Sequence, residues 1–174
     1  MESDKLRHFR LFMRKVKFRD WEFEVESDLT RKTYTKAISG FSEGCDCNYC
    51  LNYYPQKDKN FPEEIKSLFE DLGIDYHKES ECISSFSISE FSNVEEYLNG
   101  LHGYSGWFHF AGSIISGKDL DSNQNIFDTT LITDKFSIGF RQKRDLSFFE
   151  SDVPLVQVEF AVEIPWIIGE VTED

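Results

Sequence analysis

The end of this chain alternates apolar and polar residues with a period of two, the pattern of a β-strand with two different faces. Its apolar members are Val156, Val158, Phe160, Val162, Ile164 and Trp166. Gln157 and Glu159 alternate with them, so the pattern predicts a strand with one buried face and one wet face. Because Pro165 has no N–H, we expect this end of the strand at a sheet edge or a bend.

Four further segments show the same preference for strands. They are residues 16–25, 33–41, 104–115 and 129–142. In the first segment the apolar parity flips around Arg19 and Asp20, which predicts a bulge or a tight bend. The last segment reads as a hairpin that turns near Asp134. Three glycines around the third segment indicate bends or close backbone approach: Gly103, Gly106 and Gly112.

Two segments have helical patterns instead. Residues 60–73 begin with Pro62 in the first turn, carry an apolar stripe and end at Gly73. Residues 92–100 begin with a capping box of Ser92 and Glu95. Strands that follow one another without intervening helices do not build parallel crossovers. The sequence therefore predicts an α+β fold: a predominantly antiparallel sheet, in one or two layers, with one or two short helices.

The charge is distributed unevenly along the 174 residues. Residues 1–19 carry seven Lys and Arg against two acids, a net charge of +5, whereas the remainder carries twelve against thirty, a net of −18, which gives −13 in all. We interpret residues 1–12 as a basic N-terminal extension and residues 13–174 as a single domain. A rival interpretation of the extension is a short docking helix. The acidic body argues against nucleic-acid binding and suits either a basic protein partner or simple solubility.

Neither a membrane span nor a secretory leader is apparent. No apolar run approaches the roughly 18–20 residues that cross a bilayer, and the first residues lack an apolar core followed by a cleavage site. We therefore expect a cytoplasmic protein, in which thiols are reduced and clustered cysteines serve metal binding or redox chemistry more often than disulfides.

Three of the four cysteines lie in the stretch "EGCDCNYCLNYY" (residues 43–54). Cys47 and Cys50 have the two-residue gap of a zinc knuckle, and Cys45 adds a third thiol. Cys82 is the natural fourth ligand of a zinc site, with His77 or His109 as alternatives. The alternative to a metal site is that the three clustered cysteines are small, half-buried residues of a loop with no chemical role. Thiol redox chemistry is disfavoured, because residues 51–62 do not look like a helix that begins at the cysteines.

Four stretches together resemble a family of small uncharacterised bacterial proteins. They are "CDCNYCLNYY", "FPEEIKSLFEDLGID", "GYSGWFHFAGSI" and "VQVEFAVEIPW". In that family a C-x-C-x-x-C-x-N stretch precedes a proline-started helix and a strand with a Gly-aromatic-aromatic-His pattern. The resemblance spans roughly residues 13–168 and implies that Cys45, Cys47, Cys50 and Asn52 form a unit, with Cys82 outside it. It implies no established activity.

The sequence contains no phosphate-binding loop, dinucleotide fingerprint or nucleophile elbow. His109 follows Trp107 on one face of a strand, where it either lines a pocket or serves as a structural histidine. We therefore expect a non-catalytic binding or regulatory domain, of an immunity-like or adaptor type, with a structural zinc at Cys45, Cys47 and Cys50. The alternative is a metal- or thiol-dependent enzyme that uses the same cysteines.

Overall fold

The computed structural model describes residues 13–84, 92–120, 129–150 and 152–169. The predicted extension 1–12 lies outside them. The strands are β1 (Arg14–Phe18), β2 (Trp21–Val25), β3 (Glu81–Ser84), β4 (Leu101–Ser116), β5 (Thr130–Thr133), β6 (Phe136–Arg141) and β7 (Leu155–Pro165). The helices are α2 (Ser27–Lys36), α3 (Asn48–Tyr53), α4 (Lys57–Asn60), α5 (Glu63–Leu72) and α6 (Val94–Asn99), with a 3₁₀ turn, η1 (Tyr54–Gln56), between α3 and α4.

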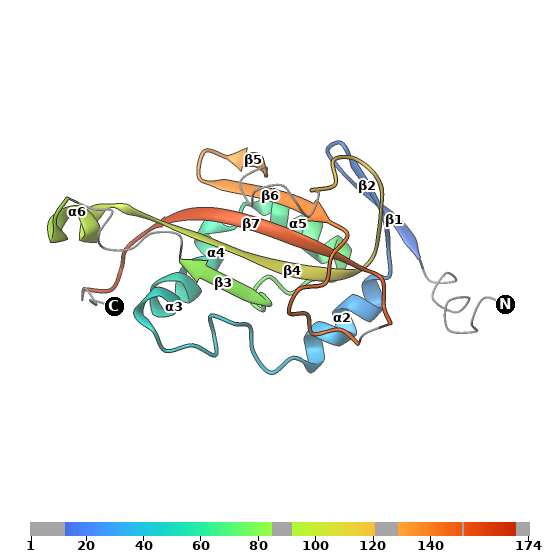
Figure 1. The fold of residues 1–174 in the computed structure, drawn as a ribbon, viewed down its shortest axis with the longest axis horizontal. Coiled ribbons are helices and arrows are strands. Elements are labelled where there is room, and N and C mark those ends of the chain that lie inside the picture. The colour runs from blue at the N-terminus through green and yellow to red at the C-terminus, as the bar shows by residue number, and fades with distance from the viewer. Residues whose placement is uncertain (1–12, 85–91, 121–128, 151, 170–174) are drawn as a thin grey trace.

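The strands form one seven-stranded sheet in which every pair is antiparallel. The order is β1-β2-β4-β7-β6-β5, and β3 also pairs with β4. The long strands β4 and β7 form its centre (Figure 1). On the other edge of β4, β3 pairs with one half of the strand and β2 with the other. The prediction of an α+β fold with a predominantly antiparallel sheet is confirmed.

One face of the sheet is aromatic and packs against α5, which lies behind the strands in Figure 1. Phe69 of α5 meets Phe108 of β4 with ring centroids 4.9 Å apart. Phe61, just before α5, contacts Phe136 of β6 and Phe160 of β7. Each of these rings is almost completely buried. Aromatic rings bury large apolar areas, so this layer supplies much of the core.

The opposite face of the sheet is polar, and it is buried at Gln157 and Glu159, the two residues predicted to form the wet face of β7. Gln157 and Glu159 are 1% and 6% exposed. Arg141 of β6 pairs with Glu159 at 2.7 Å, and Gln157 donates to Glu159 at 3.0 Å. The segment after β6 covers them: Asp145 donates its N–H to Gln157 and accepts from the Trp107 indole. Alternation shows which side chains share a face but not whether that face is covered: here it is covered at Gln157 and Glu159, whereas Glu163 farther along β7 is exposed.

The strand predicted at residues 33–41 is wrong, because most of this segment belongs to α2 and the loop after it. The Glu26 carboxylate caps the helix by accepting from the N–H of Leu29 at 2.9 Å. Thr33 and Thr35 each bond back to the carbonyl four residues earlier. Threonine and tyrosine favour strands when nothing else decides, and here the cap and tertiary contacts override that preference.

Helix α2 seals the gap that β2 and β3 leave on the edge of β4. The Tyr34 hydroxyl accepts from the backbone N–H of His109 at 3.0 Å and donates to its carbonyl at 3.1 Å. The hydroxyl of Thr30 accepts from the N–H of Ala111 at 3.0 Å. Buried backbone groups need partners, so two side chains of α2 replace a missing strand.

Several smaller predictions can be compared directly. The parity flip at Arg19 and Asp20 is a tight hairpin turn between β1 and β2, with Arg19 at φ 50°. The later hairpin turns at Asp134, between β5 and β6. Gly106 allows close approach, because a Cβ there would lie 2.1 Å from the Glu81 carbonyl oxygen. Helix α5 ends at Gly73 as predicted, and the structure adds α2, α3 and α4 to the predicted helices.

The start of α6 is shifted by one residue from the predicted capping box. Its cap is Asn93, whose side-chain oxygen accepts from the N–H of Glu96 at 2.8 Å. The Glu96 carboxylate in turn accepts from the N–H of Ser92 at 2.8 Å. The predicted capping box of Ser92 and Glu95 is therefore wrong: Asn93 is the cap, and the Glu96 side chain bonds the residue before the cap, Ser92, instead of the cap itself.

Candidate metal centre

The three clustered cysteines converge on one point. The sulfur atoms of Cys45, Cys47 and Cys50 all lie within 4.8 Å of one another, and those of Cys45 and Cys47 are 3.2 Å apart. Four sulfurs held at about 2.3 Å around a tetrahedral zinc lie roughly 3.8 Å from their neighbours. The cluster is therefore close to the dimensions of a thiolate metal site. We call residues 45–50 the cysteine turn.

The cysteine turn lies where a loop enters α3. Cys47 is the N-cap residue of α3, and its carbonyl accepts from the N–H of Leu51 at 2.9 Å. Cys50 follows one helical turn later, and residues three apart lie on the same side of a helix. The prediction that no helix begins at the cysteines is wrong, since α3, η1 and α4 follow directly. That argument against redox chemistry does not hold.

The thiols differ in their proton affinities. A hydrogen bond from the Cys47 backbone N–H is the largest cause that lowers the pKa of Cys45. Burial, together with contacts to the other two cysteines, raises the pKa of Cys50. Metals bind the thiolate form. An ion entering the cluster must therefore displace a tightly held proton from Cys50, the most buried of the three.

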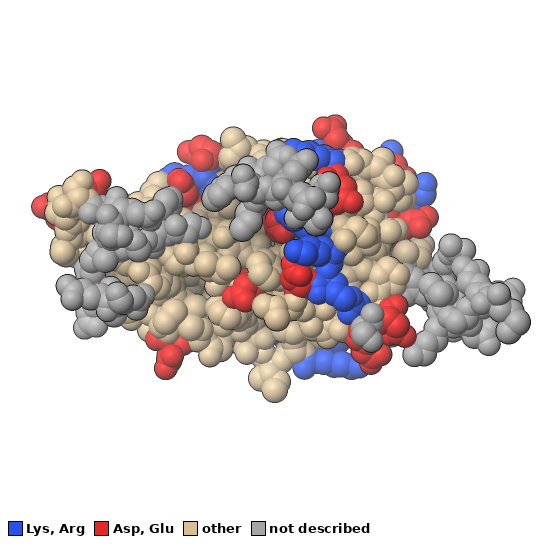
Figure 2. Space-filling view, in the orientation of Figure 1, with Lys and Arg blue, Asp and Glu red and all other residues tan. Residues whose placement is uncertain are grey.

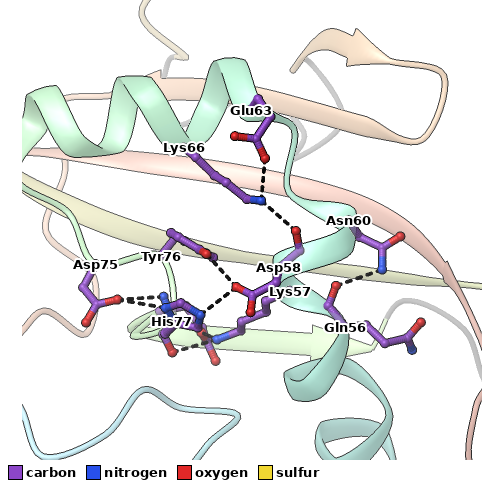
Figure 3. Close-up of polar contacts among 10 residues, drawn as sticks. Gln56, Lys57, Asp58, Asn60, Glu63, Lys66, Asp75, Tyr76 and His77 are labelled. Atoms are coloured by element: carbon purple, nitrogen blue, oxygen red, sulfur yellow. Dashed lines mark hydrogen bonds and ion pairs between the residues drawn. The ribbon is translucent and has the colours of Figure 1, made fainter.

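The loop that leads into the cysteine turn is tied down by Glu79. This buried carboxylate accepts from the N–H of Ser42 at 2.7 Å and forms an ion pair with Lys57 of α4. Lys57 also donates to the carbonyl of His77 at 2.8 Å (Figure 3). Gly40 permits close contact with this segment, since a Cβ there would lie 2.7 Å from the His77 carbonyl oxygen. Glu79 thus holds both the loop before the cysteine turn, through Ser42, and α4, through Lys57.

A second support holds α3 against the end of the sheet. Asn52 is completely buried. Its side-chain oxygen accepts from the N–H of Ile167 at 2.7 Å, and its amide donates to the Tyr104 hydroxyl at 3.1 Å and the Pro165 carbonyl at 3.3 Å. The asparagine that the resemblance groups with the cysteines therefore anchors their helix. Nothing in the sequence around Asn52 indicates that this side chain anchors α3.

The predicted fourth ligands are not members of the three-sulfur group. Cys82 is in β3, buried within the hydrophobic core, and burial raises the pKa of its thiol. The His77 ring lies between two carboxylates, with Asp58 2.9 Å from Nε2 and Asp75 3.3 Å from Nδ1 (Figure 3). Neither Cys82 nor His77 belongs to the donor group formed by the three sulfurs among the described residues.

His109 is completely buried on the polar face of the sheet. Its ring nitrogens lie 3.2 Å from the Gln157 side-chain oxygen and 3.3 Å from the Ser80 hydroxyl. Burial lowers the pKa of His109 to about 4. These contacts fit the structural role considered for this residue, although its partners are side chains. His109 also lies outside the three-sulfur group.

Comparison with known proteins gave no match to a family model, to a curated protein or to a solved structure. The resemblance to small bacterial proteins therefore stays a prediction. Within the described residues, no helix combines the length and apolar character that a membrane span requires.

Proposed function

We propose that Cys45, Cys47 and Cys50 bind one thiophilic metal ion, Zn²⁺ in the first place, as the structural centre of a non-catalytic binding or adaptor protein. The observation that carries this proposal is the convergence of three sulfurs within 4.8 Å. Thiolates select zinc, copper(I) and iron–sulfur clusters over magnesium or calcium. Zinc with several cysteine ligands is a common structural site in reduced compartments.

A metal at this position would join the loop before α3 to α3 itself. Glu79 already anchors the loop through Ser42, and Asn52 anchors α3 through Ile167. The ion would add a direct link between the loop and the helix. The loop and the helix carry exposed apolar side chains at Ile38, Phe41 and Leu51. Fixing this region would present those side chains to a partner in one arrangement, which lowers the entropic cost of binding.

We further propose that the partner is basic, because acids outnumber Lys and Arg by 32 to 19. Figure 2 shows acidic and basic side chains next to each other on the face displayed, rather than one acidic patch. The proposal of a basic partner therefore rests on long-range attraction by the net negative charge and not on a docking patch on this face. Binding of a basic partner should weaken as the salt concentration rises. Replacing the exposed Ile38 by serine should also weaken partner binding, without changing the metal content.

A thiol-dependent enzyme is the second candidate, favoured by the exposed Cys47 and the lowered pKa of Cys45. Rapid alkylation of one cysteine in the metal-free chain, faster than that of a free thiol at neutral pH, would favour it. Slow alkylation of all cysteines would favour the binding protein.

Elemental analysis of the full chain, purified without chelators, tests the metal. We expect about one zinc per chain. Cys50→Ala should abolish binding, because it removes one of three ligands, whereas Cys82→Ala should retain it as the matched control. A metal-free protein that also fails to develop a thiolate-to-metal band with Co²⁺ would contradict the proposal.

A further inference from the structure

We propose that the metal centre at the cysteine turn keeps one coordination position for a ligand from outside the chain, and that this ligand is a neutral nitrogen donor, the imidazole of a partner's histidine. This inference rests on the proposed metal site and names what completes it.

The first step is the number of ligands. Structural zinc in proteins is almost always closed by four protein ligands, and a site with only three leaves one position open; a structural centre with three ligands from this chain therefore needs its fourth from another molecule. Among the described residues, the cluster supplies three sulfurs. Asn52 uses its amide to anchor α3, and His77 is held between two carboxylates.

The second step is the direction from which a ligand arrives. Cys50 is 6% exposed, Cys45 is intermediate and Cys47 is exposed. The buried side of the cluster is therefore the side of Cys50, where α3 packs on its supports. The open side faces solvent next to Cys47. A side chain from another molecule can reach this side without any rearrangement of the sheet.

The third step is charge. Three thiolates around a divalent ion carry a net charge of −1. Residues 43–50 add Glu43 and Asp46 and contain no Lys or Arg, and Lys57 is already paired with Glu79. A fourth anion would bring another negative charge to this turn, whereas a neutral donor would not. Imidazole nitrogen is the neutral donor that zinc binds most readily, and three cysteines with one histidine form a common ligand set.

The test uses the full chain loaded with Co²⁺ in place of zinc, because cobalt absorption reports the ligand set. Imidazole is the probe, and a short histidine peptide is compared with its alanine counterpart. We expect a saturable shift of the cobalt bands, with one imidazole bound per ion. The histidine peptide should cause the same shift and the alanine peptide none. A small thiol should shift the bands only at higher concentration.

Two results would overturn the inference and leave the metal site standing. One is a cobalt–thiolate spectrum that does not change through the imidazole titration. The other is a cobalt spectrum altered by Cys82→Ala, which would place the fourth ligand within the chain. Absence of any cobalt–thiolate band would instead remove the proposed metal centre, and this inference with it. Because the wild-type titration alone decides the first point, the test does not depend on the folding of a variant.

Discussion

Tyr34→Phe tests whether the hydroxyl of one side chain takes the place of a strand on the edge of β4. The substitution removes a single oxygen atom and leaves the ring in place. In the native protein that oxygen accepts from the N–H of His109 and donates to its carbonyl. Tyr34 is 1% exposed, so water does not readily replace the lost partner.

The expected loss of stability follows from the two backbone groups left unpaired. A buried donor or acceptor without a partner costs about 1–3 kcal/mol. Two such groups that share one site, with some local relaxation, should lower the free energy of unfolding by about 2–4 kcal/mol. For a chain of this size each kcal/mol lowers Tm by roughly 2–4 °C, so Tm should fall by roughly 5–15 °C.

Urea denaturation followed by circular dichroism measures this loss, and amide hydrogen exchange at His109 locates it. Tyr76→Phe is the matched control. Its hydroxyl also donates one strong hydrogen bond, to Asp58 at 2.6 Å, but at the surface, so the cost should stay below about 1 kcal/mol. A Tyr34→Phe variant as stable as the wild type, with His109 exchange unchanged, would refute the edge-sealing role of α2.

Three further predictions concern the buried charges and the thiols. Lys57→Met should destabilise the fold by about 3–5 kcal/mol, because it leaves Glu79 buried and unpaired, and adding Glu79→Gln should restore part of the loss; additive effects would contradict this. The pKa of His109 is about 4, against 6.5 for a free histidine, so between these pH values the unfolded chain binds a proton at His109 and the folded chain does not. The free energy of unfolding should therefore fall by roughly 3 kcal/mol as the pH is lowered from 6.5 to 4. His109→Gln should flatten that decline in urea titrations, and an unchanged slope would assign it to other groups. Zinc affinity, measured by chelator competition from pH 6 to 8, should rise about tenfold per pH unit for each thiol proton displaced; a pH-independent affinity would exclude Cys50 as a ligand.

The sequence predicted the parts of the fold that depend on local pattern. Apolar alternation located β4, β6 and β7, and Pro62 with Gly73 bounded α5. These signals are read within one segment, so they do not depend on what packs against it. The turn at Arg19 and Asp20 also followed from parity alone.

The errors arose where the outcome depends on a distant segment. Residues 33–36 have strand-forming composition, yet they are helical, because Tyr34 reaches a backbone 75 residues away. Glu159 looked like a surface residue because its partner Arg141 is in the neighbouring strand. A charged residue can be buried only with such a partner, and the sequence does not show which strands are neighbours.

The candidate site divides in the same way. The convergence of three sulfurs is a local property, since Cys45, Cys47 and Cys50 lie within six positions: one turn of helix brings Cys50 next to Cys47, and Cys45 lies two positions earlier in the loop. What holds them is not local: Glu79 bonds Ser42 across 37 positions, and Asn52 bonds Ile167 across 115. Folding therefore orders the loop and helix before an ion arrives, so binding need not bear the full cost of fixing them. The affinity of the centre should depend on these distant anchors as much as on the spacing of the cysteines.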